Sequence, residues 1–169
     1  ALYKDFNKPQ LEVDLSEIYP VVDEIKFVSK HLKSWLGKQK VDTPITLLGS
    51  TSWIKNESKG VCLIISPWNY PINLTFGPLV SAIAAGNTVM LKPSEMTPHT
   101  AKVMCDIVND LFEEHEVALI EGEVEVSTEL LKLPFNHIFF TGSPQVGKIV
   151  MKAASEHLTS VTLELGGKS

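Results

Sequence analysis

The sequence predicts an α/β fold, in which a parallel sheet with helices on both faces follows one N-terminal helix. From Val61 onwards, short apolar runs typical of buried strands alternate with stretches of helical periodicity. Strands that alternate with helices of this length form parallel βαβ units. Before Val61 one helical pattern precedes an irregular stretch. We therefore expect two parts, residues 1–60 with the helix and an irregular or hairpin segment, and residues 61–169 with the sheet.

The first long helix is predicted over residues 18–35, where apolar residues recur at three- and four-residue steps. Its apolar stripe comprises Ile18, Val22, Ile25, Val28, Leu32 and Trp35. Asp14 and Glu17 stand three residues apart before it and are placed to form a capping box. From 41 to 60 the pattern breaks up, and we expect a hairpin or irregular crossing with residues 45–47 and 53–54 as its arms.

Strands and helices then alternate to the end of the chain. The apolar, β-branched runs predict strands at 61–65, 88–91, 117–120, 137–140 and 161–163. Helices are expected around 74–85, from Thr97 and Pro98 onwards, and from Ser143 and Pro144 onwards. Thr or Ser followed by Pro is the preferred pair for a helix N-cap and first turn.

Composition narrows the class of protein. A formal net charge of −5 gives no electrostatic reason to expect nucleic acid or an anionic membrane as partner. No apolar stretch approaches the roughly 20 residues that span a bilayer, and the start shows no signal peptide. Cys62 and Cys105 lie within apolar patterns, as buried thiols of a reducing compartment do. We expect no membrane contact from this segment, a cytoplasmic location and, because the histidines are scattered, no metal site.

The pentapeptide Pro67-Trp68-Asn69-Tyr70-Pro71 directly follows the predicted strand 61–65. In open α/β sheets, the carboxyl ends of strands line the ligand crevice. An Asn held there between two stiff prolines can offer N–H donors to a developing negative charge. The alternative is that Asn69 caps the next helix while Trp68 and Tyr70 fill the core.

A second polar segment, Lys92-Pro93-Ser94-Glu95, follows the next predicted strand. Lysine supplies cationic donors, serine supplies a hydroxyl, and glutamate can accept hydrogen bonds from a ribose diol. This set suits the sugar and phosphate of a nucleotide. The alternative is a solvated turn in which Lys92 and Glu95 form an exposed ion pair of negligible energy.

The third segment, residues 141–148, joins a predicted strand to a helix. Gly142 allows a tight turn, and the helix start after Ser143 offers N–H groups to an anion. Gly147 allows the backbone to approach a ligand or a neighbouring strand closely. The segment also lies one residue from a P-loop, with Ile149 in place of the Ser or Thr that binds Mg²⁺. An ATP- or GTP-binding loop and an ordinary strand–turn–helix capped by Ser143 therefore both stay open.

Glu164 ends the last predicted strand, and two glycines beyond Leu165 leave room beside its carboxylate. It lies 22 residues after Gly142, the spacing of a ribose acceptor in a dinucleotide fingerprint. Glu95 competes for that role. If Glu95 takes the ribose, Glu164 is free to act as a general base. The spacing alone leaves both assignments open.

Taken together, the motifs resemble the NAD(P)-dependent aldehyde dehydrogenase superfamily. The matching stretches, in order, are residues 67–71, 86–95, 140–147 and 163–169. The tyrosine of the pentapeptide and residues 147–151 resemble the class 3 branch, which acts on fatty or aromatic aldehydes. The fold that the resemblance implies is the variant Rossmann domain of the superfamily, here an incomplete NAD(P)-binding domain over 61–169.

The resemblance also implies a role for each motif. Asn69 would donate to the oxyanion of a thiohemiacetal, and Glu164 would activate the water that hydrolyses the thioester. Lys92 and Glu95 would hold the adenosine ribose beside Ser94, and the charge of Glu95 favours NAD, with NADP possible. The remaining cofactor contacts would come from Ser66, Pro67, Trp68, Gly142, Ser143, Val146, Gly147, Leu165 and Gly166.

One feature departs from the superfamily pattern. The nucleophilic cysteine of the superfamily lies a few dozen residues after the motif at 163–168, and neither Cys62 nor Cys105 matches it. We therefore expect an internal, inactive piece of a homo-oligomeric enzyme that oxidises aldehydes to carboxylates. A parallel sheet that lacks its remaining strands exposes an unpaired apolar edge strand, which predicts self-association of the isolated piece. The alternatives are a P-loop-like nucleotide-binding module and a non-enzymatic truncated assembly partner.

Overall fold

A five-stranded parallel sheet forms the centre of the structure, a computed structural model that describes residues 1–167. Its strands lie in the order β5–β4–β3–β6–β7, and every neighbouring pair is parallel. This confirms the predicted fold class and all five predicted strands. Their bounds are β3 (Val61–Ile65), β4 (Thr88–Lys92), β5 (Val117–Leu119), β6 (His137–Gly142) and β7 (Ser160–Leu165). Lys168 and Ser169, the end of the last matching stretch, lie outside the described residues.

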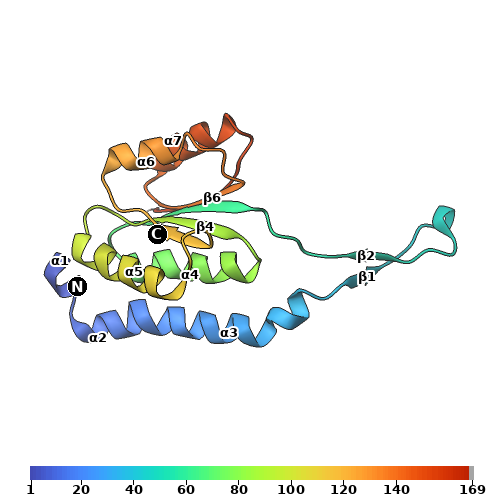
Figure 1. Ribbon diagram of the computed structural model, residues 1–169, viewed down its shortest axis with the longest axis horizontal. Coiled ribbons are helices and arrows are strands. Elements are labelled where there is room, and N and C mark those ends of the chain that lie inside the picture. Colours follow the sequence, from blue (N-terminus) through green and yellow to red (C-terminus); the bar gives the residue numbers. More distant parts are fainter. Residues whose placement is uncertain (168–169) are drawn as a thin grey trace.

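Helices cover both faces of the sheet (Figure 1). On one face lie α4 (Pro71–Ala84) and α5 (Pro98–Leu111), and on the other lie α6 (Val124–Leu130) and α7 (Pro144–Ser155). Each face of the sheet has its own hydrophobic core. Successive residues of β3 point to opposite faces, so Ile64 packs with α4 and α5 while Leu63 packs with α7. The short helix α6 was not predicted, and the others stand in their predicted places.

The N-terminal segment forms α1 (Leu2–Phe6), α2 (Gln10–Val13), a π-helical turn η1 (Asp14–Ile18) and α3 (Tyr19–Trp35), which runs beside α4 (Figure 1). The predicted capping box is wrong, because Asp14 opens the π turn and the side chain of Glu17 is fully buried.

Burial along α3 also differs from the predicted stripe. Val21 and Val28 face inward, whereas Val22 and Ile25 remain exposed. The contacts of α3 within the described residues run chiefly along α4 and η1, so its other sides stay open.

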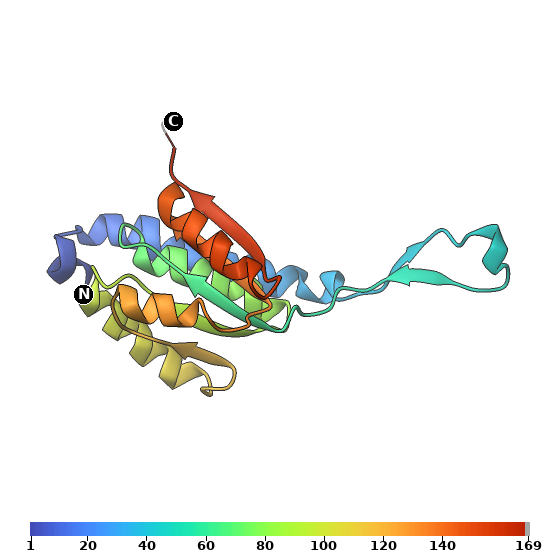
Figure 2. The same ribbon diagram turned by 90° about the horizontal axis from the view of Figure 1, so that it is seen from above.

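A two-stranded antiparallel ribbon projects from the body of the molecule (Figures 1 and 2). It pairs β1 (Gln39–Val41) with β2 (Ser52–Ile54). The prediction is correct for the second arm and wrong for the first, because Ile45–Leu47 forms a 3₁₀ turn, η2, near the tip. Pro44, at φ −55°, precedes the turn and fits its geometry.

The two cysteines differ in environment. Both are free thiols, but Cys62 is buried in the core and Cys105 is only partly buried on α5. Burial raises the pKa of the Cys62 thiol, and the nearby charge of Lys59 opposes this only in part. Among residues 1–167, no helix has the length and apolar character that crossing a bilayer requires.

Replacing Gly60 with alanine should destabilise the protein. Gly60 has a φ of +120°, and an added Cβ would overlap Asn136 Oδ1, which accepts the N–H of Val61 at 2.8 Å. We expect Gly60→Ala to lower the free energy of unfolding by about 1–3 kcal/mol in urea titrations followed by circular dichroism. Gly77→Ala is the control, since the nearest atom to its Cβ would be 3.6 Å away. Equal midpoints for both variants would contradict the expectation.

The raised pKa of Cys62 predicts a poorly reactive thiol, because the thiolate is the reacting form. In the folded protein at pH 8, iodoacetamide should modify Cys62 at least about tenfold more slowly than Cys105. Peptide mapping by mass spectrometry measures the two rates. Unfolding in urea should bring the rates together, and equal rates in the folded protein would show that the thiol of Cys62 is accessible and ionised.

Candidate functional site

The predicted site residues come together at one edge of the sheet. The chain runs from β3 outward through β4 to β5, and then returns to β6 on the other side of β3. This reversal makes a topological switch point between β3 and β6, the place where open α/β sheets bind ligands. The first motif follows β3, and the other three include the carboxyl-terminal residues of β4, β6 and β7.

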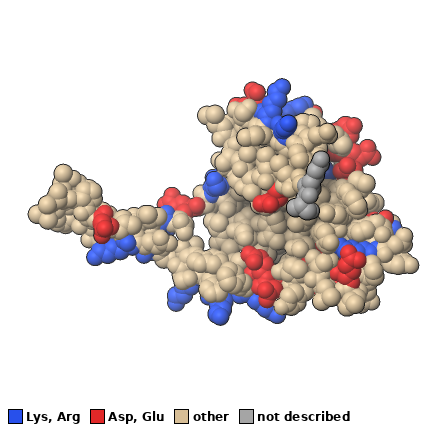
Figure 3. Space-filling model, turned by 180° about the vertical axis from the view of Figure 1, so that it is seen from behind, with Lys and Arg blue, Asp and Glu red and all other residues tan. Residues whose placement is uncertain are grey.

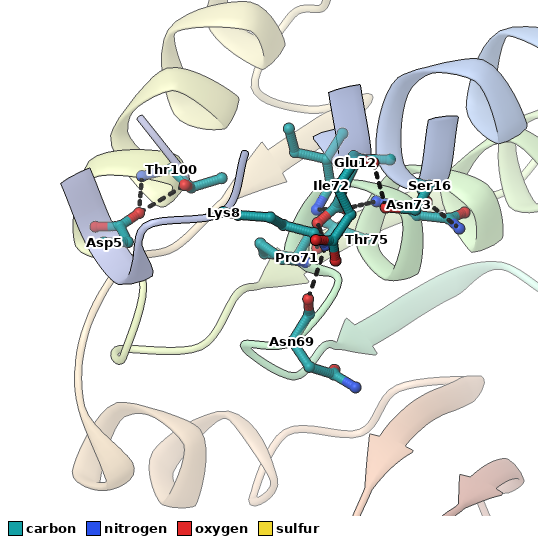
Figure 4. A network of polar contacts seen from close by, with 11 residues as sticks. Asp5, Lys8, Glu12, Ser16, Asn69, Pro71, Ile72, Asn73, Thr75 and Thr100 are labelled. Atoms are coloured by element: carbon teal, nitrogen blue, oxygen red, sulfur yellow. Dashed lines mark hydrogen bonds and ion pairs between the residues drawn. The ribbon is translucent and has the colours of Figure 1, made fainter. Parts of the chain in front are cut away.

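Asn69 is exposed in the turn between β3 and α4. Its backbone oxygen accepts a hydrogen bond from Lys8 Nζ at 3.1 Å, and its side-chain amide points away from that contact (Figure 4). Within the described residues, no hydrogen bond uses this amide. The alternative role in capping is wrong, because Tyr70 holds the N-cap position of α4 and Trp68 and Tyr70 are both substantially exposed.

The residues before Asn69 are held more tightly. Ser66 is buried, and its Oγ lies 2.5 Å from Thr75 Oγ1. Its hydroxyl is therefore engaged within the protein, and only its backbone can border a ligand. Trp68 packs edge-to-face on Phe6, with ring centroids 5.9 Å apart.

Lys92 is buried at the carboxyl end of β4, with 1% of its side chain exposed. Its Nζ donates to the Pro93 oxygen at 2.7 Å and lies 3.8 Å from Glu95 Oε2. Burial lowers the pKa of Lys92, and the charge of Glu95 partly offsets this. The alternative of an exposed ion pair is therefore wrong for Lys92. Ser94 accepts the Met96 N–H through its hydroxyl at 3.2 Å.

Spare polar groups remain around Lys92. An ammonium group has three donors, and within the described residues one of them is used, on Pro93. A cavity of about 210 Å³ adjoins the turn between Pro93, Glu95 and Glu121. Glu95 lines this cavity and Lys92 does not, so a ligand in the cavity would contact the Glu95 carboxylate, from which the Lys92 ammonium lies 3.8 Å away.

The turn between β6 and α7 is packed closely. A Cβ on Gly142 would lie 2.5 Å from Phe140 Cζ, so space under the turn requires glycine there. Ser143 is the N-cap of α7, and its Oγ accepts the Val146 N–H at 3.3 Å. Gly147 lets α7 approach β7, because a Cβ there would meet Leu165 Cδ2 at 2.9 Å. Of the two roles expected for Gly147, the structure supports the close approach to a neighbouring strand.

The near-match to a P-loop has a different geometry. A P-loop wraps phosphate with backbone N–H groups of an irregular loop. Here the helix α7 already begins at Pro144, so Gly147 and Lys148 lie within its first turns. This arrangement favours the strand–turn–helix interpretation.

Glu164 and Leu165 end β7 beside the same turn. Glu164 is exposed and pairs in register with Thr141, and Leu165 pairs with Gly142. The Gly166 N–H reaches the Gly142 oxygen at 3.4 Å, and an added Cβ at Gly166 would meet nothing within 4 Å. The carboxylate of Glu164 therefore stands at the same sheet edge as Asn69, with open space beyond it.

Thr141 begins the third segment, but no role for its hydroxyl was predicted from the sequence. Thr141 Oγ1 is buried at the carboxyl end of β6 and has no hydrogen-bond partner among the described residues. Its hydroxyl lies at the same end of the sheet as Lys92 and the start of α7. Threonine in a strand carries no sequence signal of its own. Among residues 1–167, no cluster of three potential metal ligands occurs.

Sequence and structure comparisons agree on the relatives of this chain. The sequence profile of the Aldehyde dehydrogenase family matches residues 1–169. Aldehyde dehydrogenase family 3 member B2 of Mus musculus is 47% identical over the whole chain, which covers 35% of it. The chain spans 35–38% of the length of this protein and of two other curated relatives.

Two solved structures show the same fold. The substrate-bound state of Staphylococcus aureus AldH matches 99% of this chain with a TM-score of 0.96 and 49% identity, over 37% of its own chain. A Mycobacterium tuberculosis aldehyde dehydrogenase complexed with NAD⁺ matches 99% with a TM-score of 0.87 and 26% identity, over 34% of its chain. With the profile match over all 169 residues, this chain belongs to the aldehyde dehydrogenase family.

Proposed function

We propose that this chain is the cofactor-binding portion of an enzyme that oxidises an aldehyde to a carboxylate. The observation that carries the proposal is the free amide of Asn69, at the switch point between β3 and β6 and at the same sheet edge as Glu164. The likeness to a family 3 aldehyde dehydrogenase supports an aldehyde as the substrate, and we propose a fatty or aromatic aldehyde, as the resemblance to the class 3 branch implies.

The proposed cofactor is NAD. A related dehydrogenase was solved with NAD⁺ bound, which supports a nicotinamide dinucleotide here. The Glu95 carboxylate, 3.8 Å from the Lys92 ammonium, supports a ribose site at this turn. That negative charge would repel the 2′-phosphate of NADP, which is therefore the second candidate.

Each side of the dinucleotide would meet a different motif. Lys92 and Glu95 would hold the adenosine ribose, and Ser94 would support their turn. The start of α7 at Ser143 would face the pyrophosphate. The remaining proposed contacts are Ser66 through its backbone, Pro67, Trp68, Gly142, Val146, Gly147, Leu165 and Gly166. When bound, the cofactor supplies a hydride acceptor.

The two proposed catalytic residues act before and after hydride transfer. Asn69 would donate its side-chain N–H to the oxyanion that forms when a thiolate adds to the aldehyde. Glu164 would take a proton from the water that hydrolyses the resulting thioester. Cys62, buried with a raised pKa, and Cys105 on α5 are unsuited as the nucleophile. We therefore place the nucleophile in another part of the complete enzyme and expect residues 1–169 alone to be inactive.

We also propose that the complete enzyme is a cytoplasmic homo-oligomer. The projecting ribbon carries exposed apolar side chains, Leu48 at 90% and Trp53 at 50% exposure, of the kind that subunit interfaces cover. Acidic and basic side chains are interspersed over the face shown in Figure 3, which gives no support for a nucleic-acid partner. Two free thiols agree with a reducing compartment.

Replacing Asn69 with alanine tests the oxyanion role. In the complete dehydrogenase, Asn69→Ala should lower kcat by about 10²–10³-fold, the usual cost of one lost oxyanion donor. The affinity for NAD, measured by quenching of tryptophan fluorescence, should stay within about twofold, because the amide meets the reacting carbonyl and not the dinucleotide. Asn109→Ala, an exposed asparagine on α5, is the control. An unchanged kcat for Asn69→Ala would refute this role.

Replacing Glu164 with glutamine separates the two chemical stages. Stopped-flow absorbance should show a burst of reduced cofactor followed by slow turnover, because thioester hydrolysis loses its base while hydride transfer continues. Glu156→Gln makes the same charge change at an exposed position just after α7 and should behave as the unmodified enzyme. Loss of the burst with NAD binding intact would show that Glu164 acts earlier than proposed.

A further inference from the structure

We propose that Lys8 and Glu17 are positioning residues that hold the Asn69 turn in its reactive geometry. The inference rests on the proposed function of Asn69. The two residues come from the N-terminal segment, more than fifty positions away from the turn along the chain. Figure 4 shows the side chain of Lys8 reaching toward Asn69 and the start of α4, where Lys8 also contacts Glu17.

The start of α4 depends on Glu17 for its hydrogen bonds. The first N–H groups of a helix have no partner within the helix. Pro71 has no N–H, and the N–H groups of Ile72 and Asn73 both donate to Glu17 Oε2 at 3.0 Å. The next N–H, of Leu74, reaches the Tyr70 oxygen at 2.9 Å. No side chain of the turn itself caps this helix, so the buried carboxylate of Glu17 is its cap.

Lys8 links that carboxylate to the turn. Its Nζ donates to Glu17 Oε1 at 2.7 Å and to the Asn69 backbone oxygen at 3.1 Å, and it lies 3.8 Å from the ring centroid of Tyr70. Both charged side chains are almost fully buried, at 3% and 0% exposure. A buried ion pair with its hydrogen bonds satisfied is rigid, and breaking it leaves an uncompensated charge.

The local backbone of Glu17 fits this task. Glu17 lies in the π-helical turn η1, where the Ser16 oxygen also accepts a hydrogen bond from Asn73 Nδ2 at 3.0 Å. Single π turns inside helices are frequent at functional sites. The π turn η1 therefore supplies one carboxylate and one carbonyl as acceptors for the first residues of α4. These contacts fix the position of the helix start that directly follows the Asn69 turn.

A second anchor of the same segment gives an internal comparison. Asp5 accepts the N–H groups of His99 and Thr100 at 3.0 and 2.9 Å, at the start of α5. It therefore caps the helix that follows the Lys92–Glu95 turn and makes no contact with the Asn69 turn among the contacts of the described residues. Removing the hydrogen bonds of Asp5 should leave the position of Asn69 unchanged, whereas removing those of Glu17 should change it.

The test is a double-mutant cycle in the complete dehydrogenase. Glu17→Gln keeps the size of the side chain and removes its charge. It should lower kcat by about 10–100-fold, as a small misplacement of a catalytic group does, and leave the NAD dissociation constant within about twofold. In an Asn69→Ala background the same substitution should cost no more than about twofold in kcat, because the group that it positions is already gone.

Three variants serve as comparisons. Lys8→Met removes the bond to the Asn69 oxygen while Glu17 keeps its two N–H partners, and it should show the same dependence on Asn69. It also answers the question if Glu17→Gln fails to fold. Glu12→Gln changes the charge at an exposed position of the same segment and should leave kcat unchanged. Asp5→Asn should act independently of Asn69.

The outcomes are distinct. An equal loss of kcat from Glu17→Gln or Lys8→Met with and without Asn69 would overturn the inference, as would an unchanged kcat in otherwise unmodified enzyme. If Asn69→Ala alone leaves kcat unchanged, the proposed function of Asn69 fails instead. Circular dichroism and NAD titration of every variant confirm that the compared enzymes are folded.

Discussion

The hydrogen bonding of β3 between β4 and β6 is the constraint on which the rest of the structure depends. Val61 pairs with Thr88 on one side, and Ile65 pairs with Lys92 on that side and with Phe140 on the other. Parallel pairing in register brings the carboxyl ends of all these strands to one edge. The connections after β3, β4 and β6 therefore begin there, and the first three sequence motifs include the starts of these connections, while the fourth includes the end of β7.

The strands were predictable because their signal is local. Each is a short run of apolar and β-branched residues bounded by turn residues, as in 61–65. The stretch 45–47 carries the same local preference but forms a 3₁₀ turn, because none of the strands within residues 1–167 pairs with it. The helix α6 was missed because it is only seven residues long and buries one residue, Leu130.

The positions of the site residues could be predicted from the order of the strands, whereas their hydrogen-bond partners could not. A residue that ends or closely follows a parallel strand lies at this end of the sheet whatever its neighbours are, so the positions of Asn69, Lys92 and Glu164 could be predicted from sequence. The environment of Glu17 could not, because its three partners lie near residue 8 and near residue 72. Its spacing from Asp14 suggested a local cap, and tertiary contact overrode that preference.

The π turn also has a consequence for the limits of the folding unit. The division of the chain at residue 60 stays a prediction, but Asp5 and Glu17 supply the caps of α5 and α4 from its other side. A chain trimmed to start at β3 would keep all five strands and lose both caps. The smallest part of the chain that can fold alone must therefore include the residues that cap its helices. A deletion of the N-terminal segment would leave the sheet intact but remove the caps of α4 and α5, which begin beside the candidate site.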